Sequence, residues 1–229
     1  MRNVVLLGAT GLIGSLCLQR LLTQDGINRV TALVRRPLPF SHEKLTQSVQ
    51  STEDMLRDQA LLDAHDVVSC LGTTMKTAGS KEAFYAVDHD LVVAVAQRAR
   101  DAGAQRFLMV SAVNADPDSR NFYSRTKGEA EASVMALGLP MLGMFQPSLL
   151  LGHRSERRLA EDVGQAMSRL AVPLMRRMKS RYTPIQAQTV ADAMVSTLLR
   201  GPDTGIHRYH YTEMLALAAQ RLQPALALD

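Results

Sequence analysis

The sequence predicts an α/β protein built on a doubly wound parallel sheet. Two observations support this fold class: short apolar runs alternate with helical patterns, and a glycine-rich turn joins the first apolar run to the first helical pattern. Near-continuous apolar strands joined by helices are typical of a parallel sheet that is covered on both faces. Ligands of such sheets bind outside the carboxyl ends of the strands, so we expect the functional residues there.

The chain can be divided into expected elements in order. The expected strands are 4–7, 30–34, 67–71, 107–111 and 141–145, and the expected helices are 12–22, 81–102 and 124–137. After about residue 151 the alternation becomes irregular, with a short strand expected at 207–211. We therefore expect a single domain over residues 1–229. Its core would span about residues 1–150, and a small, mixed helical C-terminal portion, 151–229, would cover the substrate or bind a partner.

The first strand leads directly into a glycine-rich turn. Gly8 can take the tight turn, Gly11 lets the backbone approach a pyrophosphate, and Gly14 lets the helix lie close to its strand. The free N–H groups at the start of the helix favour an anion. This unit predicts a Rossmann-like dinucleotide site formed by Gly8, Thr10, Gly11, Leu12, Ile13 and Gly14.

The end of the second strand indicates which dinucleotide binds. Enzymes that use NAD commonly carry an acid there, which accepts hydrogen bonds from the ribose hydroxyls. Here the strand is followed by Arg35 and Arg36, and no acid is available. A guanidinium can bind the 2′-phosphate of NADP with two hydrogen bonds and stack on adenine. The two arginines therefore favour NADP(H) over NAD.

Three polar residues predict acid–base chemistry. The strand 107–111 ends in Ser111, and Tyr123 and Lys127 follow at the start of the next helix. A spacing of four places both on one face, where the ammonium can stabilise a tyrosinate and make the phenol a usable proton donor or acceptor. Ser111 can hold a substrate carbonyl or hydroxyl. A Tyr-x-x-x-Lys pair alone is weak evidence, but its order after the glycine turn and the serine predicts a catalytic set.

These motifs, in this order, resemble the short-chain dehydrogenase/reductase superfamily in its extended or atypical branch. GATGLIGS, LVRRP, CLGTT and the stretch from SAVNAD to YSRTKGEAE carry the resemblance, which covers nearly the whole chain. The segment 70–90 looks most like the Tat-interacting oxidoreductase-like proteins of that branch. The resemblance implies a Rossmann-like fold, NADPH binding and catalysis by Ser111, Tyr123 and Lys127.

The resemblance also implies further cofactor contacts. Tyr123 and Lys127 would contact the cofactor, and the loop of Leu71, Gly72, Thr73 and Thr74 would border the adenosine and pyrophosphate. The segment Gln146-Pro147-Ser148-Leu149-Leu150 would border the nicotinamide. The sequence departs from the family at Asp88, where many extended members carry an Asn that helps to hold a water near the catalytic lysine. An Asp can also accept from that water but adds negative charge, which leaves the proton relay open.

The net charge of +4 is concentrated in one region. Between Arg154 and Arg181 there are eight Lys or Arg residues and three acids. This stretch is a solvated helix face or a surface that attracts an anionic partner, and its apolar stripe would cover the core or a dimer surface. No aromatic residues are interleaved for base stacking, so we expect no nucleic-acid binding. No run of about eighteen apolar residues occurs, so we expect no membrane span.

The cysteines and histidines do not indicate a metal or redox site. Cys17 and Cys70 are expected to face the core as small apolar groups, which favours a reducing compartment and a cytoplasmic location. The six histidines form no cluster typical of metal ligands, so we expect no metal.

Two functional hypotheses follow. The first is an NADPH-dependent reductase of an unidentified small carbonyl or activated double-bond substrate, with Tyr123 as the proton donor. The second is an NADP(H)-binding regulatory protein with little or no turnover, whose basic 154–181 region binds a partner protein or a second copy of the chain.

Overall fold

The central sheet is parallel throughout. The computed structural model describes residues 1–56, 65–152, 180–220 and 222–226. Within these residues one sheet has the strand order β3-β2-β1-β4-β5-β6-β9, and every neighbouring pair is parallel. Its strands are β1 (Arg2–Leu7), β2 (Ile27–Val34), β3 (Leu45–Val49), β4 (Asp66–Ser69), β5 (Arg106–Val110), β6 (Met141–Phe145) and β9 (Gly205–Tyr209). This order confirms the predicted doubly wound, Rossmann-like fold class.

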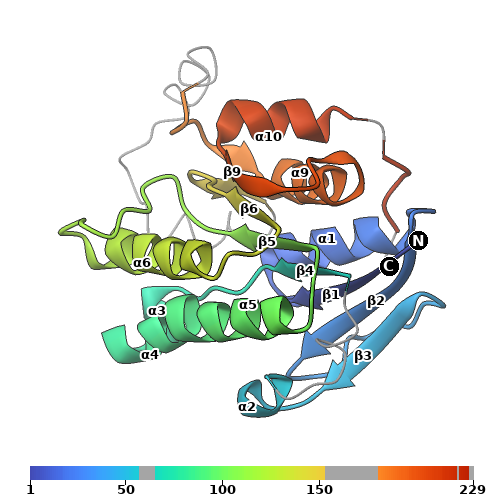
Figure 1. Cartoon of the computed structure of the whole chain (residues 1–229), viewed down its shortest axis with the longest axis horizontal. Helices are drawn as coiled ribbons and strands as arrows, with labels where there is room; N and C mark the ends of the chain where they lie inside the picture. The colour runs from blue at the N-terminus through green and yellow to red at the C-terminus, as the bar shows by residue number, and fades with distance from the viewer. Residues whose placement is uncertain (57–64, 153–179, 221, 227–229) are drawn as a thin grey trace.

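Helices cover both faces of this sheet, as Figure 1 shows. On one side lie α1 (Leu12–Leu22), α9 (Ala187–Arg200) and α10 (Tyr211–Ala218). On the other side lie α3 (Met75–Ala78), α4 (Lys81–Tyr85), a π-helix (Ala86–Leu91), α5 (Val92–Asp101) and α6 (Phe122–Ala136). The short helix α2 (Thr52–Met55) follows β3, and β7 (Leu150–Leu151) pairs with β8 (Ile185–Gln186) in a small separate sheet.

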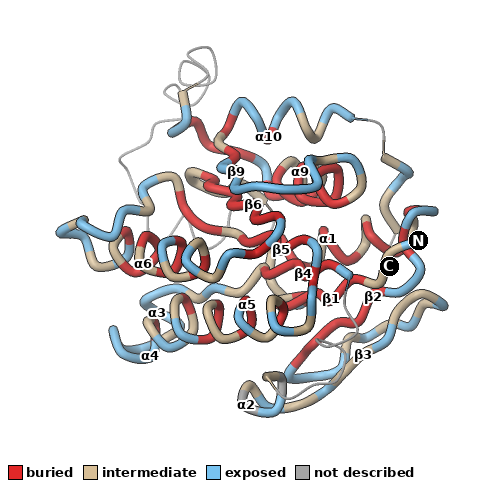
Figure 2. The backbone as a smooth tube through the Cα atoms, in the orientation of Figure 1, coloured by how far each residue is buried: buried red, intermediate tan, exposed pale blue. Residues whose placement is uncertain are grey.

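The strands supply alternate residues to two cores. Val4 and Leu6 of β1 pack with α1 and α9, whereas Val5 and Leu7 pack with α5 on the opposite face. The side chains of a strand point alternately to its two faces, so a strand buried on both faces is apolar at every position. Figure 2 shows the resulting buried sheet between more exposed helices.

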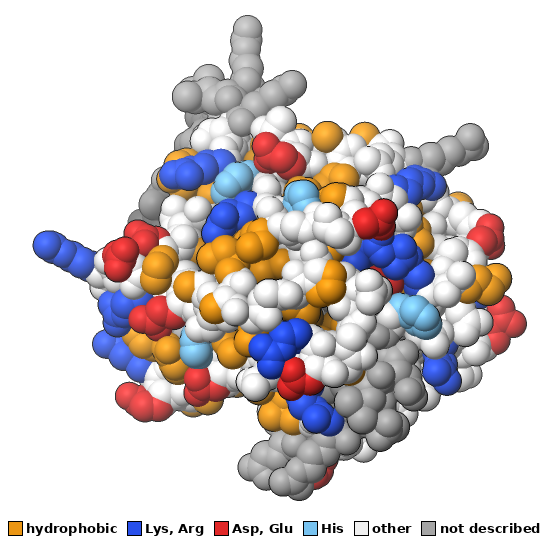
Figure 3. Space-filling model, viewed as in Figure 1, with side chains coloured by type: hydrophobic (Ala, Val, Ile, Leu, Met, Phe, Trp, Pro, Cys, Tyr) orange, Lys and Arg blue, Asp and Glu red, His pale blue; other side chains and the backbone are white. Residues whose placement is uncertain are grey.

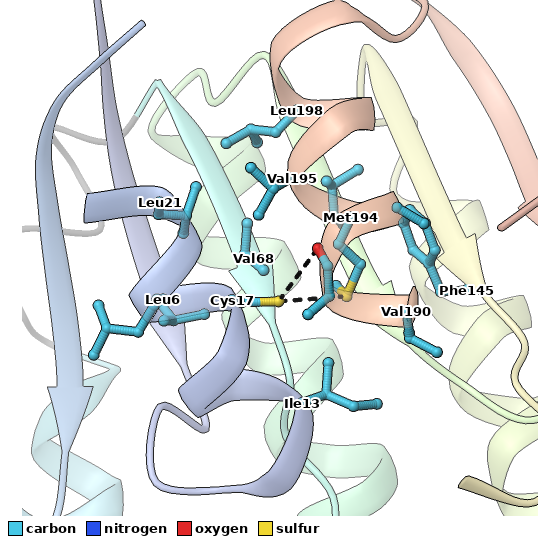
Figure 4. Packing of buried hydrophobic residues seen from close by; sticks show 14 of the residues in the cluster. Leu6, Ile13, Cys17, Leu21, Val68, Phe145, Val190, Met194, Val195 and Leu198 are labelled. Atoms are coloured by element: carbon cyan, nitrogen blue, oxygen red, sulfur yellow. Dashed lines mark hydrogen bonds between the residues drawn. The ribbon is translucent and has the colours of Figure 1, made fainter. Parts of the chain in front are cut away.

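The first core joins residues that are far apart in the sequence. Cys17 of α1 is fully buried, and its Sγ lies 4.0 Å from both the carbonyl oxygen of Ala191 and the Sδ of Met194 in α9 (Figure 4). The Cys70 thiol, as a hydrogen-bond partner, and burial raise the pKa of the Cys17 thiol. Cys17 therefore has the expected role of a small apolar core residue.

The structure differs from the expected elements in three places. The strand expected at 207–211 is β9 and ends at Tyr209, because Tyr211 already begins α10. The helix expected over 81–102 is interrupted by the π-helix. The edge strand β3 was not expected, because its five residues are half-exposed and show no apolar run.

Candidate active site and cofactor-binding site

The glycine-rich turn lies at the carboxyl end of β1, between its two neighbours β2 and β4. Gly8 has a φ of +76°, and a Cβ there would lie 2.4 Å from the carbonyl oxygen of Cys70. A Cβ on Gly14 would lie 2.1 Å from the carbonyl oxygen of Gly8. Only glycine fits either position, so α1 can begin directly against the turn. Gly11 is the N-cap of α1 and has no side chain to cap the first N–H groups, which therefore remain available to an anion.

The other residues expected in the turn have different surroundings. Thr10 is exposed and Leu12 is half-buried, whereas Ile13 is 6% exposed and packs into the core. Ile13 can therefore contact a pyrophosphate only through its backbone N–H group. Its side chain instead anchors α1, whose amino end faces the expected pyrophosphate site.

The loop after β4 is held by a buried carboxylate. The backbone N–H of Thr73 donates to Oδ2 of Asp88 over 2.8 Å, and Thr74 caps α3 by accepting from the N–H of Thr77. Asp88 lies in the π-helix, in which the wider i→i+5 spacing alters the direction of side chains; such segments are frequent at functional sites. The π-helix thus connects the expected adenosine and pyrophosphate loop to the helix layer.

The same carboxylate also binds Lys127. Oδ1 of Asp88 lies 2.6 Å from the Nζ of Lys127, and the side chains are 1% and 6% exposed. A Cβ on Gly72 would lie 3.7 Å from this Nζ and 3.4 Å from Oδ1 of Asp88, so the loop runs directly past the ion pair. Asp88 therefore joins two expected cofactor-binding elements, the 71–74 loop and α6. The residue at which the sequence departs from the family is thus a positioning residue of this site.

Ser111 and Tyr123 are placed differently from each other. Ser111 directly follows β5 and is 4% exposed, and its Oγ has no hydrogen-bond partner within the described residues. A buried hydroxyl without a partner is costly, which is consistent with a site that a ligand completes. Tyr123 lies in the first turn of α6, is 41% exposed, and packs its ring against that of Phe84 at 5.7 Å. Its phenol can therefore be reached by a small molecule.

The segment after β6 runs beside Ser111. The N–H of Ser111 donates to the carbonyl of Phe145, and the N–H of Val113 donates to the carbonyl of Pro147. The hydroxyl of Ser148 donates to the carbonyl of Thr183, and the N–H of Ile185 donates to the carbonyl of Leu149. Pro147 is thus tied to the loop after Ser111, whereas Leu149 and the Ser148 hydroxyl hold the chain at β8 and the residues before it. The predicted contact of this segment with the nicotinamide stays a prediction.

Arg35 and Arg36 follow the carboxyl end of β2, which pairs directly with β1. Both are exposed, and neither has an ion-pair or hydrogen-bond partner in the part of the chain that the structure describes. They therefore lie at the end of the sheet where the glycine-rich turn lies, with donors available to an anion.

Two contacts in the structure were not predicted from the sequence. A Cβ on Gly128 would lie 2.2 Å from the backbone of Asp116 and Pro117, so the loop after Ser111 presses directly onto α6. One turn further on, the buried Glu131 carboxylate accepts hydrogen bonds from Nε2 of Gln146 at 2.7 and 2.9 Å. The spacing of four from Tyr123 through Lys127 to Glu131 is visible in the sequence and could have indicated the second contact.

The basic region lies mostly outside the described residues. Of its charged residues only Arg181 is described, because the structure does not describe 153–179. Elsewhere, basic and acidic side chains are interspersed on the face of the molecule that Figure 3 shows.

Comparison with known proteins identifies the family. A family model described as NAD(P)H-binding matches residues 8–200, from the glycine turn to the end of α9. The chain belongs to this family. The protein fmp52, mitochondrial, of Aspergillus niger is 35% identical over 203 residues, which is 86% of either chain. The protein HTATIP2 of Rattus norvegicus is 36% identical over 164 residues, which is 70% of this chain and 67% of that protein. These relatives confirm the resemblance to atypical short-chain dehydrogenase/reductases.

Solved structures show the same fold at low sequence identity. MoeE5 in complex with UDP-glucose and NAD has a TM-score of 0.64 and 17% identity, covering 98% of this chain and 84% of that one. A UDP-N-acetylglucosamine 4-epimerase from Methanobrevibacter ruminantium has a TM-score of 0.67 and 15% identity, covering 91% of this chain and 76% of that one. Identities this low support the fold alone.

The expected cytoplasmic location is wrong. The FMP52 relatives from Aspergillus niger and Saccharomyces cerevisiae are named as mitochondrial proteins. The expectation depended on the two cysteines being free thiols, and free thiols do not distinguish one compartment from another. Among the described residues, no helix has the length and apolar character needed to cross a membrane.

Proposed function

We propose that this protein is an NADPH-dependent reductase of a small carbonyl compound or activated double bond. The proposal depends chiefly on one observation: the buried Lys127 ammonium is held 2.6 Å from Asp88, whose other oxygen holds the N–H of Thr73. An ammonium fixed between α6 and the 71–74 loop is in place to bind a ribose hydroxyl and to influence the phenol one helical turn away.

The residues of the chain have distinct roles in the proposed reaction. The glycine-rich turn holds the pyrophosphate, and Arg35 with Arg36 holds the 2′-phosphate. When bound, reduced nicotinamide supplies a hydride to the substrate carbon. Ser111 donates a hydrogen bond to the carbonyl oxygen, and Tyr123 transfers a proton to that oxygen. Lys127 binds the ribose and stabilises the tyrosinate that remains, which solvent then reprotonates.

The test is NADPH oxidation by the purified protein with a panel of aldehydes and ketones. We expect Tyr123→Phe to lower turnover by about 10²- to 10⁴-fold with a much smaller change in NADPH affinity, because the proton donor is lost while the glycine-rich turn, the two arginines and Lys127 remain to bind the cofactor. Tyr85→Phe is the matched control, since this tyrosine of α4 stacks on His89 at 4.5 Å and has no role in the proposed reaction. NADPH binding without turnover of any acceptor would contradict the proposal and favour the regulatory hypothesis.

A further inference from the structure

A pocket lined by two arginines lies close to the backbone of two proposed catalytic residues, Ser111 and Lys127. It has a volume of about 370 Å³ and lies between α6, the loop after β5 and the end of β9. Val113 and Gly128 contribute to its lining, and they lie two residues after Ser111 and one residue after Lys127. The pocket therefore adjoins the backbone that positions both residues. Its volume is near the lower end of the range for ligand sites, about 300–1,000 Å³, which favours a small molecule.

Positive charge exceeds negative charge in this pocket. Its charged lining residues are Arg181, Arg208 and Glu131. The side chain of Arg208 is 46% exposed, and its Nε lies 3.8 Å from an oxygen of Glu131, too far for a strong hydrogen bond. The Nη2 of Arg181 donates to the phenol of the neighbouring Tyr182 over 2.7 Å, and its guanidinium lies 4.9 Å from the centre of that ring. Both guanidiniums thus retain donors for a ligand.

The negative charge in the pocket is already bound from within the protein. Both carboxylate oxygens of Glu131 accept from Nε2 of Gln146, and both residues are about 4% exposed. His210 also lines the pocket, and its buried Nδ1 has no hydrogen-bond partner among the described residues. The charged groups left for a ligand are therefore the guanidinium donors of Arg181 and Arg208, whereas the His210 ring nitrogen can donate or accept according to its tautomer. A carboxylate or phosphate group meets such a set better than a neutral or cationic group does.

We infer that this pocket binds the acidic group of the substrate, and that the protein acts on small carbonyl compounds that carry a carboxylate or phosphate. This inference rests on the proposed function for the reaction, but the binding of an anion stands apart from turnover. With Arg208 and Arg181 holding the acidic group, the carbonyl would extend along the 111–117 loop toward Ser111. The basic pair thereby selects the substrate, while Ser111 and Tyr123 act on it.

The first test is calorimetry on the full-length protein, with and without NADP⁺, using 4-formylbenzoate, its neutral counterpart 4-formylbenzamide, and phenyl phosphate. We expect both anions to bind at least tenfold more tightly than the amide, and the preference to weaken at high salt. A preference for one anion alone identifies the acidic group as carboxylate or phosphate. Equal binding of the acid and the amide, or no binding of any probe, would overturn the inference.

Three variants sharpen the test. We expect Arg208→Gln to weaken anion binding by about 10- to 100-fold, because a charge-assisted hydrogen bond is lost. Glu131→Gln should strengthen it, because the opposing carboxylate is removed, whereas a site for a cation would respond in the opposite direction. Arg200→Gln, at the exposed end of α9, is the matched control and should change nothing. Equal losses of anion affinity in Arg208→Gln and Arg200→Gln would show that the anion does not bind in this pocket.

Failure of the proposed function is distinguishable from failure of this inference. If the protein binds the anions with these variant effects but never oxidises NADPH, the anion-binding pocket is supported and the reductase proposal is refuted. If it reduces benzaldehyde and 4-formylbenzoate with equal kcat/KM, the reductase proposal is supported and the preference for acidic substrates is refuted.

Discussion

Asp66 and Asp88 are both buried carboxylates that face a cation, but they lie at opposite ends of the sheet. Asp66 begins β4, where Nη1 of Arg2 lies 2.9 Å from Oδ2 and Nη1 of Arg106 lies 3.7 Å from Oδ1. Asp88 lies beyond the carboxyl ends of the strands and binds Lys127 and the N–H of Thr73. The first carboxylate joins three neighbouring strands, whereas the second joins a π-helix, α6 and a loop.

This difference separates the residues that hold the fold from those that hold a ligand. At the amino end, Arg106 also pairs with Asp203, so the buried carboxylate belongs to a network of charges within the protein. At the carboxyl end, the Ser111 hydroxyl and the two arginines after β2 lack partners among the described residues. Substitutions at the two ends should therefore change different measurable properties.

The largest effect is expected for Asp66→Ala. It leaves the buried Arg106 beside an empty space and should lower the free energy of unfolding by about 3–5 kcal/mol, as measured by urea titration. Asp203→Ala is the control, because the Asp203 side chain is 89% exposed and its loss should cost at most about 1 kcal/mol. If Asp66→Ala does not fold, Asp66→Asn provides the comparison. Equal small losses in the Asp66 and Asp203 variants would contradict a structural role for Asp66.

Asp88→Asn should chiefly change cofactor binding. The amide can still accept from the N–H of Thr73 but no longer neutralises Lys127, so we expect NADPH affinity to fall about 10-fold or more. Fluorescence titration of NADPH measures this. The control is Asp90→Asn in the same π-helix, where the exposed carboxylate pairs with His89 instead. A large loss of stability with unchanged affinity would show that Asp88 is equivalent to Asp66.

Arg35→Ala should weaken the binding of NADPH by about tenfold and leave the binding of NADH almost unchanged, because only NADPH carries the extra phosphate. Arg29→Ala is matched to it, since this exposed arginine lies toward the amino end of the same strand. Titration of both cofactors against both variants provides the measurement. Identical losses for NADPH and NADH would exclude a contact with the 2′-phosphate.

The smallest effect is a pH dependence of stability at the amino end. Burial raises the pKa of Asp66 above its ordinary value of 3.8, although Arg2 and Arg106 oppose the shift. Between 3.8 and the folded-state pKa, the folded protein binds more protons at this position than the unfolded protein. The contribution of Asp66 to stability should therefore rise as pH falls through this window and be lost as pH rises. Urea titrations of wild type and Asp66→Asn across this range measure it. If the free energy of unfolding of wild type increased relative to that of Asp66→Asn as pH rises, the predicted direction would be wrong.

Much of the fold could be predicted because its causes are local. The apolar runs, the glycine-rich turn and the helix 12–22 depend on neighbouring residues, and α1 has these predicted bounds. The exposed strand β3 was missed because its half-polar sequence has no apolar run and it forms only by pairing with β2. The packing of α9 against α1 likewise brings Met194 to Cys17 over a separation of 177 residues, which no local pattern reports.

The same division applies to the site. The sequence by itself determined the residue types and their order: three glycines, two arginines after a strand, and Ser111, Tyr123 and Lys127. Only the tertiary structure decided that Asp88 pairs with Lys127, that Ser148 is turned to Thr183, and that Glu131 and Arg208 share a pocket. The physical reason is that a motif fixes the spacing of residues along one element. The partner of a buried charge is instead fixed by how separate elements pack.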